Sequence, residues 1–142
     1  MTQYDTISKE ALSLLVRRFY ARVRADEQLG PVFERAVDDW DAHLEKLTEF
    51  WSAVTLGTRG FHGSPVQAHQ AQSDHIQPHM FERWLGLWEN TTNELFTAAP
   101  AADLQEKARR IGRSLKMSLE LPRDEAPFAQ EIRLRRPISA KP

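Results

Sequence analysis

The sequence predicts an all-α fold in a single domain. Apolar residues recur at the i, i+3, i+4 spacing of one helix face over several long segments. Residues that commonly start or stop helices flank these segments, and no segment alternates apolar and polar residues as a half-buried strand does. At 142 residues, with 41% apolar and 27% charged residues, the chain is long enough to close one sizeable core.

The first helix is predicted from Ser8 to Arg24, with Ser8 placed to cap the free N–H groups of the first turn. Gly30 and Pro31 break this helix. A proline suits a first helical position, so a short helix is predicted from Pro31 to Val37. The apolar stripe of the first helix consists of Leu12, Leu15, Val16, Phe19, Tyr20 and Val23.

A third helix is predicted to begin after Asp38 or Asp39 and to end at Leu56, where Gly57 supplies a left-handed stop. Four residues advance a helix by about 400°, so residues spaced by four drift only about 40° and share a face. That face is predicted to point at one part of the molecule. The residues on it are His43, Leu47 and Trp51.

Residues 57–79 are rich in glycine, proline and polar residues, and they are predicted to form a long ordered loop that carries His69. Loops of this length in compact domains are usually functional. A helix from His79 to Phe96, closed by Pro100, follows, and then a last helix from Ala102 to Leu121. The folded domain is thus predicted to span residues 1–121.

Residues 122–142 form a proline-rich, basic tail in this prediction. Two interpretations fit its composition, a solvated flexible end and a contact with an anionic partner or a membrane surface. The sequence shows no internal repeat.

Composition and charge exclude several classes of function. The net charge of −1 gives no basic field for nucleic-acid binding. No targeting segment and no run of roughly 18 apolar residues is present, so we expect a cytoplasmic protein with no membrane span. The chain has no cysteine, which removes disulfides, iron–sulfur clusters and thiolate ligands. Any metal must be held by imidazole or oxygen.

His69 is the strongest candidate for such a metal ligand. It stands in the polar loop between two helical segments that are unusually rich in large aromatics, a combination that favours a flat aromatic cofactor, haem. A simple exposed histidine is the alternative. A zinc pair of His75 and His79 is disfavoured, because Pro78 between them disrupts the helix that would give their spacing meaning.

Tyr20 and Trp84 can be interpreted as core residues or as hydrogen-bond donors. Large aromatics at helical spacing usually supply packing area. However, two buried donors aimed into one cavity need an acceptor. A diatomic gas on ferrous iron is such an acceptor, because bound dioxygen draws electron density from the metal.

Several short motifs, in this order and spacing, resemble the truncated haemoglobin family, and within it the group III branch. The resemblance covers roughly residues 5–121. The motifs that carry it are Phe19-Tyr20, Val23-Arg24-Ala25-Asp26, Leu29-Gly30-Pro31-Val32-Phe33, Trp40-x-x-His43, Phe50-Trp51, Leu56-Gly57, Gly63-x-Pro65-x-x-x-His69 and Phe81-x-Arg83-Trp84-Leu85-x-Leu87.

The resemblance implies a two-over-two sandwich of helices around haem b, with His69 as the proximal iron ligand. It also implies that Tyr20 and Trp84 are the distal hydrogen-bond donors and that His43 lies at the distal gate, although an imidazole there could also swing toward solvent. The other cofactor-binding residues that it implies are Phe19, Leu47 and Trp51.

The function expected from this resemblance is a haem-binding globin that takes dioxygen, nitric oxide or carbon monoxide at ferrous iron. Nitric oxide dioxygenation or weak peroxidase chemistry would extend this function and would need a reductase partner. The alternative is a cofactor-free helical interaction or sensor module of globin-like fold. Its signature would be loss of His69, which is present.

Overall fold

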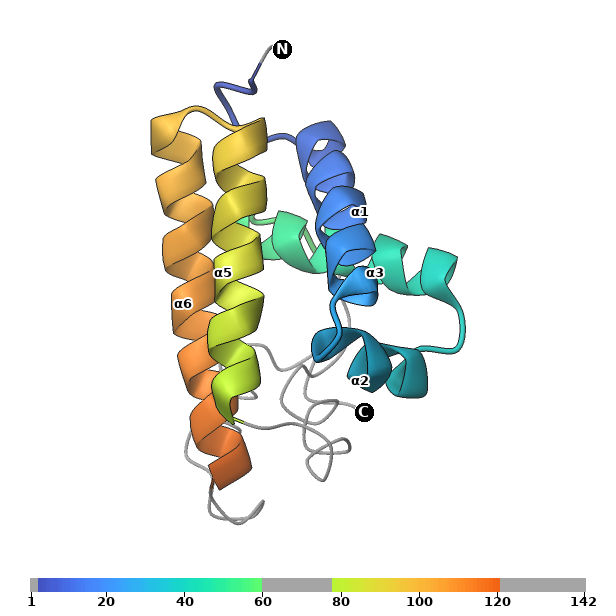
Figure 1. Ribbon diagram of the computed structural model, residues 1–142. Helices are drawn as coiled ribbons and strands as arrows, with labels where there is room; N and C mark the ends of the chain where they lie inside the picture. Colours follow the sequence, from blue (N-terminus) through green and yellow to red (C-terminus); the bar gives the residue numbers. More distant parts are fainter. Residues whose placement is uncertain (1–2, 60–77, 121–142) are drawn as a thin grey trace.

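The computed structural model describes residues 3–59 and 78–120, and within them the chain forms helices and no strand (Figure 1). The all-α prediction is therefore confirmed for this part of the chain. The helices are α1 (Lys9–Ala25), α2 (Leu29–Ala36), α3 (Trp40–Leu56), α5 (Pro78–Leu95) and α6 (Ala98–Glu120).

Local capping explains several of the helix ends. The Ser8 hydroxyl accepts a hydrogen bond from the backbone N–H of Ala11, and the Asp39 carboxylate accepts one from Ala42, so both predicted N-caps are confirmed. Gly57 ends α3 in the left-handed region at φ 75°, as predicted. These ends depend only on side chains within a few residues of the helix.

The two proline boundaries were predicted wrongly. Helix α2 begins at Leu29, two positions before Pro31, because the Asp26 carboxylate accepts from the backbone N–H groups of Gln28 (3.0 Å) and Leu29 (2.9 Å). Pro100 does not close α5; it lies in the first turn of α6. The first-turn N–H groups of a helix have no partner within the helix, so a proline costs little anywhere in that turn.

The helices form two packed pairs. Helix α5 runs antiparallel to α6 beside it, and α3 crosses α1 at a steep angle (Figure 1). Helix α1 joins the two pairs by packing antiparallel against α5, and the short α2 packs against α1 (Figure 1). This arrangement agrees with the predicted two-over-two sandwich.

One continuous core fills the space between the two pairs of helices. Helix α1 supplies most of one side, and α5 and α6 supply the other. The largest side chains with less than 2% exposure in the described residues are Trp51, Trp88, Phe19, Phe96, Leu12, Leu15 and Leu104. Burial of this aromatic mass is the main force that holds α1 and α3 to α5 and α6.

The N-terminal residues fasten the far end of α5. Tyr4 pairs with Phe96 in an isolated parallel bridge, in which the Tyr4 N–H donates to the Leu95 carbonyl (2.8 Å). The Gln3 amide donates to the carbonyls of Asn93 (2.9 Å) and Phe96 (3.1 Å). These bonds satisfy carbonyl groups that the end of α5 leaves open.

Several sequence predictions fall outside the described residues. These are the interior of the loop predicted over residues 57–79, including His69, and the tail over residues 122–142. Within the described ranges, no helix combines the length and apolar character that crossing a bilayer requires.

We predict that Gly30→Ala destabilises the fold. A Cβ atom at Gly30 would lie 2.6 Å from the Arg24 carbonyl oxygen, which belongs to the backbone and cannot turn away. We expect the free energy of unfolding to fall by about 1–3 kcal/mol in urea titrations. Gly86→Ala is the matched control, because a Cβ atom there meets nothing within 4 Å. This control should gain about 0.5–1 kcal/mol, and equal stability of the two variants would contradict the prediction.

Candidate functional site

Tyr20 is the centre of an aromatic cluster that three helices build. Its ring centroid lies 4.7 Å from that of Phe19 on α1 and 5.6 Å from that of Phe33 on α2. On α3, the rings of Trp40 and His43 lie 6.2 and 6.1 Å away. The contacts with Phe19, Phe33 and His43 are edge-to-face, the arrangement that aromatic quadrupoles favour.

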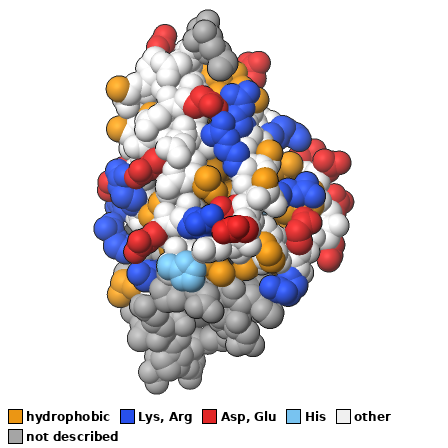
Figure 2. All heavy atoms as spheres, in the orientation of Figure 1, with side chains coloured by type: hydrophobic (Ala, Val, Ile, Leu, Met, Phe, Trp, Pro, Cys, Tyr) orange, Lys and Arg blue, Asp and Glu red, His pale blue; other side chains and the backbone are white. Residues whose placement is uncertain are grey.

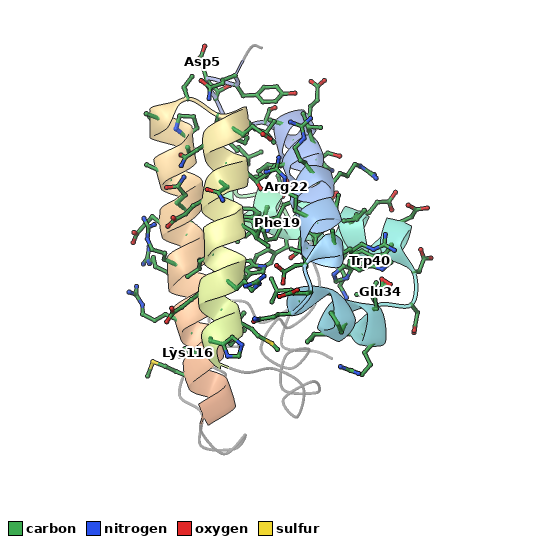
Figure 3. The ribbon with its side chains drawn as sticks, in the orientation of Figure 1. Asp5, Phe19, Arg22, Glu34, Trp40 and Lys116 are labelled. Carbon is green, nitrogen blue, oxygen red and sulfur yellow. The ribbon has the colours of Figure 1, made fainter. Side chains whose placement is uncertain are left out.

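Phe19 connects this cluster to α5. Its ring packs edge-on against Trp84 (5.7 Å) and Trp88 (4.9 Å), and it lies between α1 and α5 (Figure 3). Trp88 in turn stacks against Trp84 at 5.9 Å and against Trp51 of α3 at 4.5 Å. A row of three indoles therefore runs from the Tyr20 side of the core to α3.

The two α5 tryptophans use their indole N–H groups differently. Trp88 is fully buried, and its Nε1–H donates to the Leu104 carbonyl of α6 at 3.1 Å, so its polar group is satisfied within the core. Trp84 is only half-buried, and its side chain hydrogen-bonds to Tyr20. Of this pair, Trp84 is the one whose donor serves the Tyr20 cluster.

The environment of Tyr20 keeps its hydroxyl protonated. Burial raises its pKa from 10.0 to about 12, and the hydrogen bond from Trp84 opposes this rise in part. The side chain is 4% exposed. The phenol is thus a buried, neutral donor at neutral pH.

A polar cluster covers the outer edge of Trp40. The Arg24 guanidinium lies over the indole at 4.4 Å, and the indole Nε1–H donates to Glu34 at 3.2 Å. Arg24 and Glu34 also form an ion pair at 3.4 Å. Figure 3 shows Trp40 and Glu34 close together where α2 faces the start of α3. These contacts tie α1, α2 and α3 together beside the ring of Tyr20.

A second polar contact joins the turn after α1 to α5. The Arg83 Nε–H is shared between the two Asp26 oxygens, at 2.7 and 2.8 Å. The Arg83 hydrogen bond is the main reason that the pKa of Asp26 lies below its ordinary value. In Figure 2, basic and acidic side chains lie next to one another along the face where α1 and α5 meet.

The structure brings together most of the site residues that the sequence predicts. The cluster around Tyr20 contains Phe19, His43 and Trp84. Trp51 lies on the far side of Trp88, and Leu47 is half-buried against the same core. The predicted iron ligand, His69, lies outside the described residues. The predicted roles of all these residues remain proposals.

Of the disfavoured zinc pair, only His79 lies within the described residues. The Nε2 atom of His79 lies 3.0 Å from the side-chain oxygen of Gln28, whereas His75 lies outside the described residues. In the ranges 3–59 and 78–120, no three His, Cys, Asp or Glu side chains are grouped so that they could hold a metal ion.

Sequence reasoning missed Phe33 as a member of the cluster, and it counted Trp40 among the aromatics of the flanking helices without assigning it a contact at the site. Both belong to motifs that carry the resemblance. Phe33 reaches Tyr20 because Asp26 starts α2 early and so sets its rotation. Trp40 lies three residues before His43, a spacing that places both on one helix face and was a usable signal.

Comparison with known proteins decides the family. The profile of the bacterial-like globin family matches residues 2–118, most of the chain. The chain belongs to this globin family. The resemblance predicted from the motifs is confirmed, as is the all-α globin fold.

Similar proteins agree with this assignment. A group 3 truncated hemoglobin of Campylobacter jejuni is 30% identical over 113 residues, which cover 77% of this chain and 88% of that protein. The crystal structure of a group III truncated hemoglobin from Campylobacter jejuni matches with a TM-score of 0.77 and 29% identity, covering 83% of this chain and 95% of that one. A group 1 truncated hemoglobin of Mycolicibacterium paratuberculosis is 38% identical over 71 residues, 49% of this chain and 51% of that protein.

Membership of this globin family implies haem binding, and the described residues fit such a cofactor. A flat apolar ring needs aromatic walls, which Phe19, Trp51 and the Tyr20 cluster offer. A polar gas held beside the ring needs a buried hydrogen-bond donor, and the neutral Tyr20 phenol can act as one.

We predict an alkaline loss of stability that depends on Tyr20. The pKa of this phenol is 10.0 in the unfolded chain and about 12 in the folded globin. Between these values the unfolded state binds fewer protons, so the free energy of unfolding falls as pH rises, by up to about 2–3 kcal/mol. Tyr20→Phe should remove this loss in urea titrations across the window. Tyr4→Phe, which replaces the other tyrosine, should retain it, and a Tyr20→Phe profile parallel to wild type would contradict the prediction.

Proposed function

We propose that this globin binds haem b and takes dioxygen or another diatomic gas at ferrous iron. The observation that carries the proposal is the buried, neutral Tyr20 phenol, which accepts from Trp84 inside an aromatic cluster. A neutral phenol can donate a hydrogen bond, and we propose a polar gas ligand as its acceptor. His69, in the position that matches the family motif, is proposed as the iron ligand.

Side chains of this globin are proposed to hold the gas through hydrogen bonds. Haem, when bound, supplies an iron centre that shares electron density with a diatomic ligand. We propose that Tyr20 donates to the ligand, while the single indole N–H of Trp84 donates to the Tyr20 oxygen and so supports the phenol. A hydrogen bond to a partly charged ligand is worth about 1.5–3 kcal/mol, so the Tyr20 bond should slow loss of the ligand by about 10- to 10²-fold.

The remaining predicted residues form the walls of the proposed site. Phe19 is completely buried and Trp51 nearly so, so the surrounding core holds both rings in fixed positions, and we propose that each contacts the cofactor by one edge or face. Leu47 and His43 occupy the same face of α3 as Trp51, and the His43 ring packs edge-on against Tyr20 and Trp40. The His43 ring thus lies beside that of Tyr20, and we propose His43 as the residue at the entrance to the site.

Strong retention of the gas favours chemistry over transport, because a carrier must release its cargo. We propose conversion of nitric oxide and dioxygen to nitrate as the leading reaction, with weak peroxidase activity as a second. The first reaction would oxidise ferrous haem to ferric haem and so would need a reductase partner, whereas the second would take its electrons from a donor substrate. Nitric oxide consumption by the purified globin with a cognate reductant tests this part of the proposal.

The His69→Ala variant tests the proposed iron ligand. We expect the wild-type globin, expressed in haem-sufficient cells, to be red with a Soret band. The variant should lose most of this band or show the altered ferrous and carbonyl spectra of a weakly held haem. His79→Ala is the matched control, since His79 contacts Gln28, and its spectrum should not change. A wild-type protein without a Soret band would favour the cofactor-free interaction module.

Tyr20→Phe tests the proposed donor. Loss of its hydrogen bond should speed dioxygen release by about tenfold or more, which corresponds to about 1.4 kcal/mol or more. Stopped-flow release from the purified ferrous protein measures this rate, with Tyr4→Phe as a control that removes the other phenol. A Tyr20→Phe rate equal to wild type would remove the phenol from the proposed mechanism.

A further inference from the structure

We propose that Asp26 and Arg83 are positioning residues that hold Trp84 in place against Tyr20, and so set the hydrogen bonds of the gas site. This inference rests on the proposed function, because it concerns the two proposed donors. It adds a role for two residues that lie outside the aromatic cluster itself.

The contact between the two side chains has a defined geometry. Arg83 Nε lies 2.7 and 2.8 Å from the two Asp26 oxygens. One of these oxygens also accepts from the backbone N–H groups of Gln28 and Leu29. The Asp26 side chain is only 9% exposed. Hydrogen bonds from the backbone of the turn before α2 therefore hold the Asp26 carboxylate in place. Arg83 binds a carboxylate whose position is fixed.

The position of this contact along α1 and α5 links it to the donors. Helices α1 and α5 run antiparallel, so contacts later in α1 fall earlier in α5. Phe19 of α1 meets Trp88 and Trp84 of α5, and Asp26, just after the end of α1, meets Arg83. Arg83 directly precedes Trp84 in the chain.

The chemistry of this contact suits orientation better than stability. Apolar packing such as that of Phe19 against α5 depends on area and has little directional preference. A charged hydrogen bond fixes direction. Adjacent helical residues point about 100° apart, so anchoring Arg83 to Asp26 fixes the rotation of α5 and with it the direction of the Trp84 indole. Arg83 is 39% exposed, and exposed ion pairs add little to stability.

Two variants break the contact from opposite sides. Asp26→Asn keeps the oxygen that accepts from the N–H groups of Gln28 and Leu29, so it spares the α2 cap. It removes the charge and replaces the other oxygen, 2.7 Å from Arg83, with an amide donor, so the charged contact becomes at most one hydrogen bond to a neutral acceptor. Arg83→Gln removes the cation and keeps a helix-forming side chain. Neither change touches a ring of the cluster, so both proteins should fold.

The C–O stretching frequency of the ferrous carbonyl protein measures the placement of the donors without measuring activity. Hydrogen-bond donors near the oxygen of bound carbon monoxide shift the frequency of this band. When the donors are misplaced, the frequency returns toward its unshifted value. Both variants should move the band toward its position in Trp84→Phe and should speed dioxygen release by about threefold to tenfold. The double variant should show no more than either single variant, because both remove one interaction. Arg83→Lys, which keeps the cation, should restore part of the shift.

Glu94→Gln is the matched control, since it breaks the Arg18 and Arg22 ion pairs in the same helix interface, far from Trp84. It should leave the band unchanged. A band unmoved by Asp26→Asn and Arg83→Gln but moved by Trp84→Phe would overturn the positioning role and leave the proposed function standing. Equal band shifts in Asp26→Asn, Arg83→Gln and Glu94→Gln would overturn it too, because any loosening of the interface between α1 and α5 would then be enough to move the donors. A band that neither Tyr20→Phe nor Trp84→Phe moves would remove the donor assignment, and this inference with it.

Discussion

The position of the Phe19 ring decides where the other side chains of the candidate site lie. Its edge-on contacts with Trp84 and Trp88 fix the packing of α1 against α5. Tyr20 is the next residue, about 100° further around the helix. It must therefore turn away from Trp88 and toward α2 and α3, where Phe33 and His43 meet it. One buried contact between two helices thus orients the phenol toward the proposed gas site.

Much of the fold could be predicted because its signals are local. The caps at Ser8, Asp39 and Gly57 act within three or four residues, so the sequence alone places three helix ends correctly. The errors at Pro31 and Pro100 arise from treating a proline as a marker of one position. Proline is tolerated through a whole first turn, and the start of α2 is set by the Asp26 carboxylate instead.

The site was predicted less completely, for a different physical reason. Helical spacing and family motifs name which side chains share a face, but they do not say how two distant helices are rotated against each other. The contact of Asp26 with Arg83 spans 57 positions, and that of Gln3 with Phe96 spans 93. No local pattern marks either pair. Phe33 was missed because its place depends on the start of α2, which depends on Asp26.

The order of hydrogen bonds in the proposed site follows from the chemistry of its two polar rings. An indole N–H only donates, whereas a phenol both donates and accepts. When Trp84 donates to the Tyr20 oxygen, the phenol proton is directed elsewhere, toward a gas in the proposed function. A phenol that accepts one hydrogen bond becomes a stronger donor in the next, because linked hydrogen bonds polarise one another. The site therefore depends on the angle between the two rings as well as on their presence, and the rotation of α5 sets that angle.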